Sequence, residues 1–305
     1  MDQFSVDAAQ AKQRLDLFVL TQYPESTRAR IQQWIEADRV QVNGSTSKSS
    51  YRLREGDAVA VEPAAAPPLH AEPEAIPLVL LYEDADVVAI DKPAGMVVHA
   101  GAGVTSGTLV NALLHHFQEL STGSAAERPG IVHRLDRFTT GVILAARNDR
   151  AHQALALQFL ERKIEKVYLT LVHGEFAQAA GTIRKPITRD PSNRARMTAR
   201  LREGRSAITH WKVLRRFHGY TFLEVRIGTG RTHQIRVHMA STGHPVVGDR
   251  LYGAPAEPQG LPAPQRYFLH AHSIGFAQPT TKEAIVVESP LTEDIVSWMD
   301  RLEPI

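Results

Sequence analysis

The stretch 130–141 contains the residues of this chain that are best suited to catalysis. Its sequence, Gly-Ile-Val-His-Arg-Leu-Asp-Arg-Phe-Thr-Thr-Gly, places one carboxylate, Asp136, among His133, Arg134 and Arg137. Neighbouring positive charge favours the ionised form of a carboxylic acid. An ionised aspartate in such a setting can act as a nucleophile or a base, and it can equally be one half of a structural ion pair. The stretch alone leaves these alternatives open.

Four further segments bring charged residues, histidines and glycines together in short clusters. They are Asp-Lys-Pro-Ala-Gly at 91–95, Lys-Val-Tyr at 166–168, Gly-Arg-Thr-His-Gln-Ile-Arg-Val-His at 230–238 and Gly-His-Pro-Val-Val-Gly-Asp at 243–249. In this order and spacing, together with 130–141, they resemble the RluA/RluD family of pseudouridine synthases. The resemblance covers about residues 76–290 and is nearest the RluD type.

The resemblance implies an enzyme that isomerises uridine to pseudouridine in large-subunit (23S) ribosomal RNA, after turning the target base out of its stack. It implies that Asp136 is the catalytic residue and that Arg134 helps to fill the gap left by the base. It implies that Tyr168 packs against the base and that Arg231 pairs with Asp136. Without the resemblance, Tyr168 would be interpreted as a strand tyrosine of the core.

The local sequence around Arg231 is compatible with this pairing. Thr232 is a suitable N-cap for a helix over 233–241, and Gly243 is a suitable residue to end it. Arg231 would then lie at the positive end of the helix dipole, where an anion such as Asp136 is stabilised.

No cofactor or metal is expected. The implied reaction breaks the N-glycosidic bond and rejoins the ribose to carbon-5 of the base without a redox step. The chain contains no Walker-type phosphate loop, no GxGxxG motif and no cysteine, which excludes thiolate zinc sites. His133, His233, His238 and His244 are the remaining candidates for a metal. His233 and His238 are five residues apart and would lie on different helix faces, so we expect hydrogen-bonded structural histidines.

The charge distribution indicates a polyanionic partner. The 305-residue chain has a net charge of only +2, yet residues 160–216 hold 14 Lys/Arg and five Asp/Glu. Such a basic sector is typical either of nucleic-acid binding or of a solvated surface without a partner. No apolar run reaches membrane-spanning length and no secretory signal is visible, so we expect a cytoplasmic protein, with a monomer favoured.

The first 63 residues form a predicted domain of their own. Two short helices and a hairpin with an Asn43-Gly44 turn resemble the small RNA-binding module named after a ribosomal small-subunit protein, the S-four domain. Arg14, Arg28 and Arg30 are its candidate RNA-binding residues, although the segment up to Glu62 has eight Lys/Arg and nine Asp/Glu and is not basic overall. Residues 64–77 are predicted to be a Pro/Ala-rich linker.

The predicted catalytic domain spans residues 78–305. Strand-like segments intermix with helical ones over 108–117 and 151–161 without a regular βαβ alternation. This pattern predicts an α+β fold with a mixed, mainly antiparallel sheet and flanking helices, next to a small α/β N-terminal domain. The resemblance implies that this sheet is curved and carries the active site in a cleft.

Three features concern RNA contact. Lys92 is either a phosphate-binding residue or a lysine of a turn beside the cleft. Residues 184–205, with eight basic and two acidic side chains, predict a mobile basic loop over the RNA backbone. Phe138 stands where the family commonly has an acidic or small residue, which bears on substrate preference because this side chain could line the cleft.

Two rival functions come from other classes. A non-catalytic RNA-binding or ribosome-assembly factor on the same fold would not need Asp136, Tyr168 and Arg231 together. A nucleoside or glycoside hydrolase would need a second activating acid or a metal. The sequence therefore favours a pseudouridine synthase.

Overall fold

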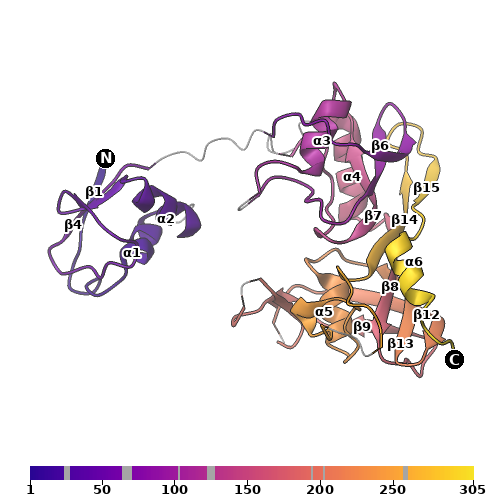
Figure 1. Ribbon diagram of the computed structural model, residues 1–305. Helices are drawn as coiled ribbons and strands as arrows, with labels where there is room; N and C mark the ends of the chain where they lie inside the picture. Colours follow the sequence, from indigo (N-terminus) through magenta and orange to yellow (C-terminus); the bar gives the residue numbers. More distant parts are fainter. Residues whose placement is uncertain are drawn as a thin grey trace. The chain divides into compact units, whose positions relative to one another are not determined.

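The computed structural model describes residues 1–23, 28–63, 71–101, 104–121, 128–193, 195–201, 203–256 and 260–305. The chain divides into two units, Met1–Leu69 and His70–Ile305 (Figure 1). Each unit has a hydrophobic core of its own.

The N-terminal unit packs two helices on a small antiparallel sheet. Its elements are β1 (Asp2–Ser5), α1 (Leu15–Gln22), α2 (Arg28–Glu36), β2 (Val40–Val42), β3 (Ser45–Thr46) and β4 (Ala58–Val61), with strand order β1-β4-β2-β3. Apolar residues of both helices, including Phe18 and Trp34, are buried together in its core. Asn43 and Gly44 both have positive φ, as a tight hairpin turn between β2 and β3 requires.

A nine-stranded sheet forms the body of the second unit. In spatial order its strands are β5 (Val79–Glu83), β6 (Val87–Lys92), β7 (Thr140–Ala146), β14 (Leu269–Ala277), β8 (Glu165–His173), β13 (Tyr220–Ile227), β12 (Ile208–Phe217) and β9 (Ala180–Arg184), with β15 (Ala284–Glu288) paired to β14. Only β7 and β14 run parallel, and the other pairs of this sheet are antiparallel. The predicted mixed, mainly antiparallel sheet is therefore observed.

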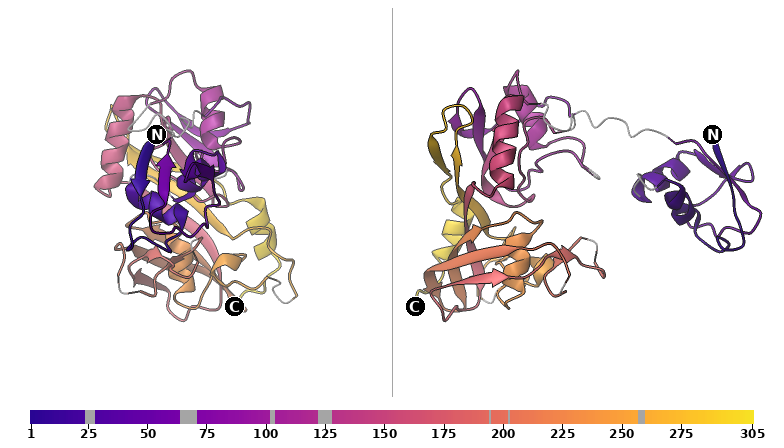
Figure 2. Two further views of the ribbon diagram at one scale, coloured as in Figure 1. Left: turned by 90° about the vertical axis from the view of Figure 1, so that its left-hand side faces the viewer. Right: turned by 180° about the vertical axis from the view of Figure 1, so that it is seen from behind.

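Helices cover both faces of the β6–β7 half of this sheet (Figures 1 and 2). Ile143 and Ala145 of β7 pack in the cluster that contains α3 (Leu109–His116), while Val142 and Leu144 pack in the cluster that contains α4 (Asp149–Leu160). Covering on both faces explains why the apolar run of β7 is continuous rather than alternating.

Three shorter helices belong to the rest of this unit. They are α5 (Gln234–Ala240), the 3-10 turn η1 (Arg250–Tyr252) and α6 (Glu293–Met299). A separate two-stranded sheet joins β10 (Thr188–Arg189) to β11 (Met197–Thr198), inside the segment predicted to be a mobile loop. That segment therefore contains a short hairpin, with Arg194 and Arg202 outside the described residues.

The predicted linker differs from the structure at its C-terminal side. Residues 64–70 lie outside the described residues. Further along, the Asn111 side chain of α3 donates to the Glu72 carbonyl at 2.7 Å, and the Glu74 carboxylate accepts from the Gly107 N–H at 3.0 Å. These bonds hold residues 72–74 against the rest of the second unit, to which they belong.

The contact between β7 and β14 requires glycine at position 141. Gly141 has φ +104°, and a Cβ placed there would lie 2.2 Å from the carbonyl oxygen of Ala271. We predict that Gly141→Ala lowers the free energy of unfolding by about 3 kcal/mol or more, because both backbone strain and a clash with rigid backbone result. Gly219→Ala, at φ +77° but in open space, is the matched control and should cost only about 1 kcal/mol. Urea unfolding of both variants measures the difference, and equal losses would contradict the prediction.

Candidate active site

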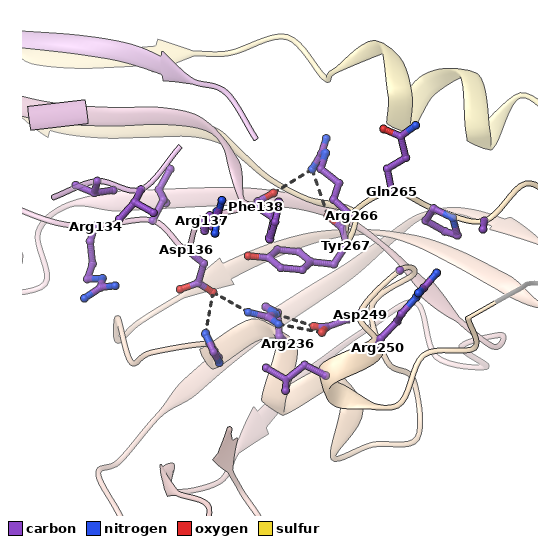
Figure 3. Close-up of a pocket in the computed structure, with 18 of the residues that line it drawn as sticks. Arg134, Asp136, Arg137, Phe138, Arg236, Asp249, Arg250, Gln265, Arg266 and Tyr267 are labelled. Carbon is purple, nitrogen blue, oxygen red and sulfur yellow. Dashed lines mark hydrogen bonds and ion pairs between the residues drawn. The ribbon is translucent and has the colours of Figure 1, made fainter. Parts of the chain in front are cut away.

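Asp136 lies in the loop that precedes β7, at the wall of a cavity of about 760 Å³ (Figure 3). Its side chain keeps 19% of its surface exposed, so a reactant can reach the carboxylate. Arg134, Arg137 and Phe138 from the same loop also line this cavity, and η1 and the segment 263–267 form further parts of its wall.

Arg236 is the ion-pair partner of Asp136. Its Nη1 lies 3.3 Å from Oδ2 of Asp136, while Nε and Nη2 bind the two carboxylate oxygens of Asp249 at 2.6 and 2.9 Å. The aromatic rings of Tyr267 and Tyr252 lie 4.0 and 5.1 Å from the guanidinium carbon. Burial alone would lower the pKa of Arg236, but the hydrogen bonds to Asp249 raise it, so this guanidinium stays charged.

The prediction that Arg231 pairs with Asp136 is wrong. Nε of Arg231 donates instead to the carbonyl of Ser206 at 3.3 Å. The helix begins one residue later than predicted. Its N-cap is His233, which has a left-handed conformation with φ 56°, and Thr232 does not cap it. Arg231 precedes α5, as predicted, whereas Arg236 lies within the helix and reaches the carboxylate.

Asp136 also borders a second, smaller cavity of about 110 Å³. Arg134, Tyr168 and Arg231 line this cavity with it. The structure thus brings together the four residues that the sequence proposed for the site, although Arg231 binds the carbonyl of Ser206 rather than Asp136. Tyr168 is buried on β8, and burial, followed by the negative charge of Asp136, raises the pKa of its hydroxyl.

Lys92 is not available to a phosphate. Its side chain is fully buried, and its Nζ donates to the carbonyls of Pro93, Met96 and Arg137 at 2.8, 3.0 and 3.1 Å. Burial lowers the pKa of Lys92 to about 7. Lys92 therefore has a structural role and does not contact phosphate. Its hydrogen bonds connect the turn after β6 to the loop that carries Asp136.

Each histidine that was considered for a metal bonds to protein groups. Nε2 of His133 accepts from the Leu144 N–H at 2.9 Å. Nδ1 of His233 bonds to the Tyr252 hydroxyl at 2.8 Å, and burial lowers the pKa of this imidazole against the opposing effect of Asp136. The remaining contacts are those of His238 with Thr209 and Lys185, and of His244 with the carbonyl of His173. In the described part of the chain, no group of three or more His, Cys, Asp and Glu side chains could hold a metal ion.

The candidate RNA-binding residues of the N-terminal unit are only partly described. Nε of Arg14 lies 2.9 Å from Oδ1 of the buried Asp16, and the Arg14 side chain keeps 30% of its surface exposed. The side chains of Arg28 and Arg30 lie outside the described residues. Whether the three arginines share one face therefore stays a prediction.

Sequence reasoning missed several residues that support the site. Arg236 and Asp249 stand inside the quoted segments 230–238 and 243–249, but nothing in their spacing shows that they meet. Arg266 was also missed, although its guanidinium binds the Asp294 carboxylate at 2.8 Å and the Phe138 carbonyl at 3.3 Å. It follows a Pro-rich stretch that gave no catalytic signal.

Residues 86–241 match the family model for RNA pseudouridylate synthase. The chain belongs to this family. Residues 13–59 match the S4 domain, so the pseudouridine synthase carries a second, RNA-binding module. Both predicted resemblances are confirmed.

Relatives extend the similarity over almost the whole pseudouridine synthase. An RNA pseudouridine synthase of Aquifex aeolicus is 45% identical over 304 residues, or 96% of each chain. The ribosomal large subunit pseudouridine synthase D of Xanthomonas campestris is 42% identical, covering 96% of this chain and 89% of that protein. The solved structure of human RNA pseudouridylate synthase domain containing 1 has a TM-score of 0.59 and 26% identity, covering 80% of this chain and 92% of that one. Within the described ranges, no helix has the length and apolar character needed to cross a bilayer.

Arg236 should be required for turnover because it holds the carboxylate of Asp136, the predicted catalytic residue. We predict that Arg236→Gln lowers the single-turnover rate of pseudouridine formation about a hundredfold, and that Arg236→Lys, which keeps the charge but not the paired bonds to Asp249, lies in between. Release of label from uridine labelled at carbon-5 measures the rate. Arg231→Gln is the comparison. If Arg231→Gln abolished turnover while Arg236→Gln stayed active, Arg231 and not Arg236 would be the functional partner of Asp136.

Lys92 should contribute to stability rather than to RNA affinity. We predict that Lys92→Met lowers the free energy of unfolding by about 3 kcal/mol, because three buried carbonyls lose their donor, and changes RNA affinity by less than about twofold. Lys212→Met, at an exposed lysine of β12, controls for the lost charge. Urea unfolding and fluorescence anisotropy with RNA measure the two quantities. A loss of affinity at unchanged stability would restore the phosphate contact.

Proposed function

We propose that this pseudouridine synthase isomerises uridines of large-subunit ribosomal RNA, with Asp136 as its catalytic carboxylate. The observation that carries the proposal is the position of this carboxylate, which is open to both cavities and held from behind by Arg236. Relatives at 37–42% identity are named ribosomal large subunit pseudouridine synthase D, which supports the choice of RNA. The proposed substrate implies action in the cytoplasm.

The reaction needs an ionised group beside the glycosidic bond. The bond between N1 of uracil and C1′ of the ribose breaks, the base turns, and a bond forms between C5 and C1′. C5 then loses its proton and N1 gains one, so that the product is an isomer of the substrate. A carboxylate can attack, or stabilise the positive charge that develops when the first bond breaks. The guanidinium of Arg236, fixed by Asp249, holds the Asp136 carboxylate at the wall of both cavities.

The smaller cavity is the proposed site of the target base. Tyr168 offers a ring from β8 beside Asp136, and Ile227 and Leu269 add apolar surface. A cavity with an aromatic ring and apolar side chains beside polar ones suits an everted pyrimidine, since the base loses its stacking partners when it leaves the helix. Arg231 lies at the same cavity and is positioned to bind a polar edge or a phosphate.

Arg134 is proposed to take the place of the everted base. It forms no hydrogen bond or ion pair with the other residues that the structure describes, and Figure 3 shows its guanidinium on the side of Asp136 away from Arg236. A cation with this freedom can enter the stack and approach the phosphates without breaking an existing contact. The S4 domain and the basic segment around β10 and β11 are the proposed sources of further RNA affinity.

Label release from large-subunit RNA tests the proposal. We predict that the protein releases label from uridine carbon-5 of large-subunit RNA, and that Asp136→Asn lowers the rate about a thousandfold or more while RNA binding is retained. The exposed Asp300→Asn at the end of α6 is the matched control and should behave as the wild type.

Two outcomes would contradict the proposal. Folded wild-type protein that releases no label from any large-subunit fragment, but binds it, would favour the non-catalytic assembly factor. Activity of Asp136→Asn close to that of the wild type would remove this carboxylate from the mechanism. The monomeric state stays a prediction, and sedimentation of the active protein measures it.

A further inference from the structure

The larger cavity has an aromatic wall that the isomerisation of one uridine does not use. Phe138 lines this cavity with 39% of its surface exposed, only two residues after Asp136. The target base is assigned to the smaller cavity, which Tyr168 lines together with Asp136. A volume of about 760 Å³ is in the range of sites that hold a whole small molecule, and it remains unassigned.

We propose that Phe138 is a stacking platform for an unpaired nucleobase next to the target uridine. The inference rests on the proposed function, because it takes the ligand of the larger cavity to be the RNA that presents the uridine to Asp136. Every nucleobase has a face that stacks on an aromatic ring, and such stacking is the common means of holding single-stranded RNA.

The Phe138 ring is held in place before any ligand binds. Tyr267 packs edge-to-face against it, with ring centroids 6.2 Å apart and an interplanar angle of 85°. Arg266 donates to the Phe138 carbonyl at 3.3 Å, and Nε of Arg137 donates to the Gly95 carbonyl at 3.0 Å. A ring fixed in this way loses little conformational entropy when a base stacks on it.

The charges around the ring fit a nucleic-acid ligand. Arg137 lies over the Phe138 ring, with its guanidinium carbon 5.4 Å from the ring centroid, and Arg250 lines the same cavity. Neither arginine has a carboxylate partner among the residues that the structure describes, whereas Arg266 is paired with Asp294. Cations that are not neutralised by protein carboxylates can bind the phosphates on either side of a stacked base.

A polar side chain in the wall of the larger cavity could distinguish one nucleobase from another. Gln265 lies at this wall, and Figure 3 shows its amide on the side of the cavity away from Asp136. An amide can donate to one atom of a base edge and accept from another. Phe138 and Gln265 together therefore fit a nucleobase better than a purely apolar ligand or a free phosphate.

A double-mutant cycle between protein and RNA tests the proposal. The probe is a large-subunit stem-loop that the wild-type enzyme modifies, with each loop nucleotide beside the target replaced in turn by an abasic one. For one flanking position, the abasic change should raise the wild-type KM about tenfold. Phe138→Leu, which keeps apolar volume but has no aromatic face, should raise KM on intact RNA similarly and lose most of the sensitivity to that abasic position. Phe138→Tyr should restore both.

A second readout does not depend on turnover. In the Asp136→Asn background, 2-aminopurine at the same flanking position should be quenched on binding by Phe138 protein and not by the Phe138→Leu variant. Val286→Ala, at an exposed apolar residue of β15 that does not line the cavity, is the control and should leave the quenching unchanged.

Failure of the inference and failure of the proposed function give different results. If every abasic position weakens Phe138→Leu as much as the wild type, or no flanking 2-aminopurine is quenched by the wild-type ring, the stacking site is overturned while label release still supports the enzyme. If the protein releases no label from any RNA, the proposed function fails. Quenching of a single-stranded oligoribonucleotide that depends on Phe138 would then still support the stacking site.

Discussion

The two ion pairs that Arg236 forms, with Asp136 and with Asp249, are the interaction on which the rest of this structure depends. One cation is shared between two carboxylates, but the two ends differ. The Asp249 side chain is 1% exposed and forms paired bonds, whereas the Asp136 side chain is 19% exposed and forms one longer bond. Removing one partner of a buried ion pair costs about 3–5 kcal/mol. Asp249 therefore fixes the cation, and Asp136 is the end that stays accessible to a substrate.

The fold brings together the residues of these two ion pairs. Asp136 and Arg236 are separated by 100 positions in the sequence, and the first lies before β7 while the second lies on α5. They meet because β14, a strand from near the C-terminus, is inserted between β7 and β8. Tyr267, just before β14, brings its ring over Arg236, and Arg266 beside it binds both the loop of Asp136 and α6.

Most residues of the site could be predicted from the sequence, because they stand within motifs of the family. The contacts between these residues could not be predicted. The motifs located Asp136, Tyr168 and Arg231, and the patterns of apolar residues predicted the mixed sheet. The pairing of Asp136 with Arg236 rather than with Arg231 depends on a contact between residues 100 positions apart, which no side-chain spacing reveals. The role of Lys92 depends on three carbonyls, two of them in its own turn and one on the catalytic loop, and only the folded chain brings them together.

The same network explains why such a site transfers the ribose back to the base rather than to water. Hydrolysis of a glycosidic bond generally uses two carboxyl groups, one to protonate or attack and one to activate water. A second carboxyl group does line the cavity, that of Asp249, but both its oxygens are bound to Arg236 and its side chain is almost fully buried. It cannot accept a proton from water without breaking the bonds that fix Arg236. In the proposed mechanism Asp136 therefore acts without a partner base, and the released uracil, proposed to lie beside Tyr168, is the nearest acceptor for the ribose.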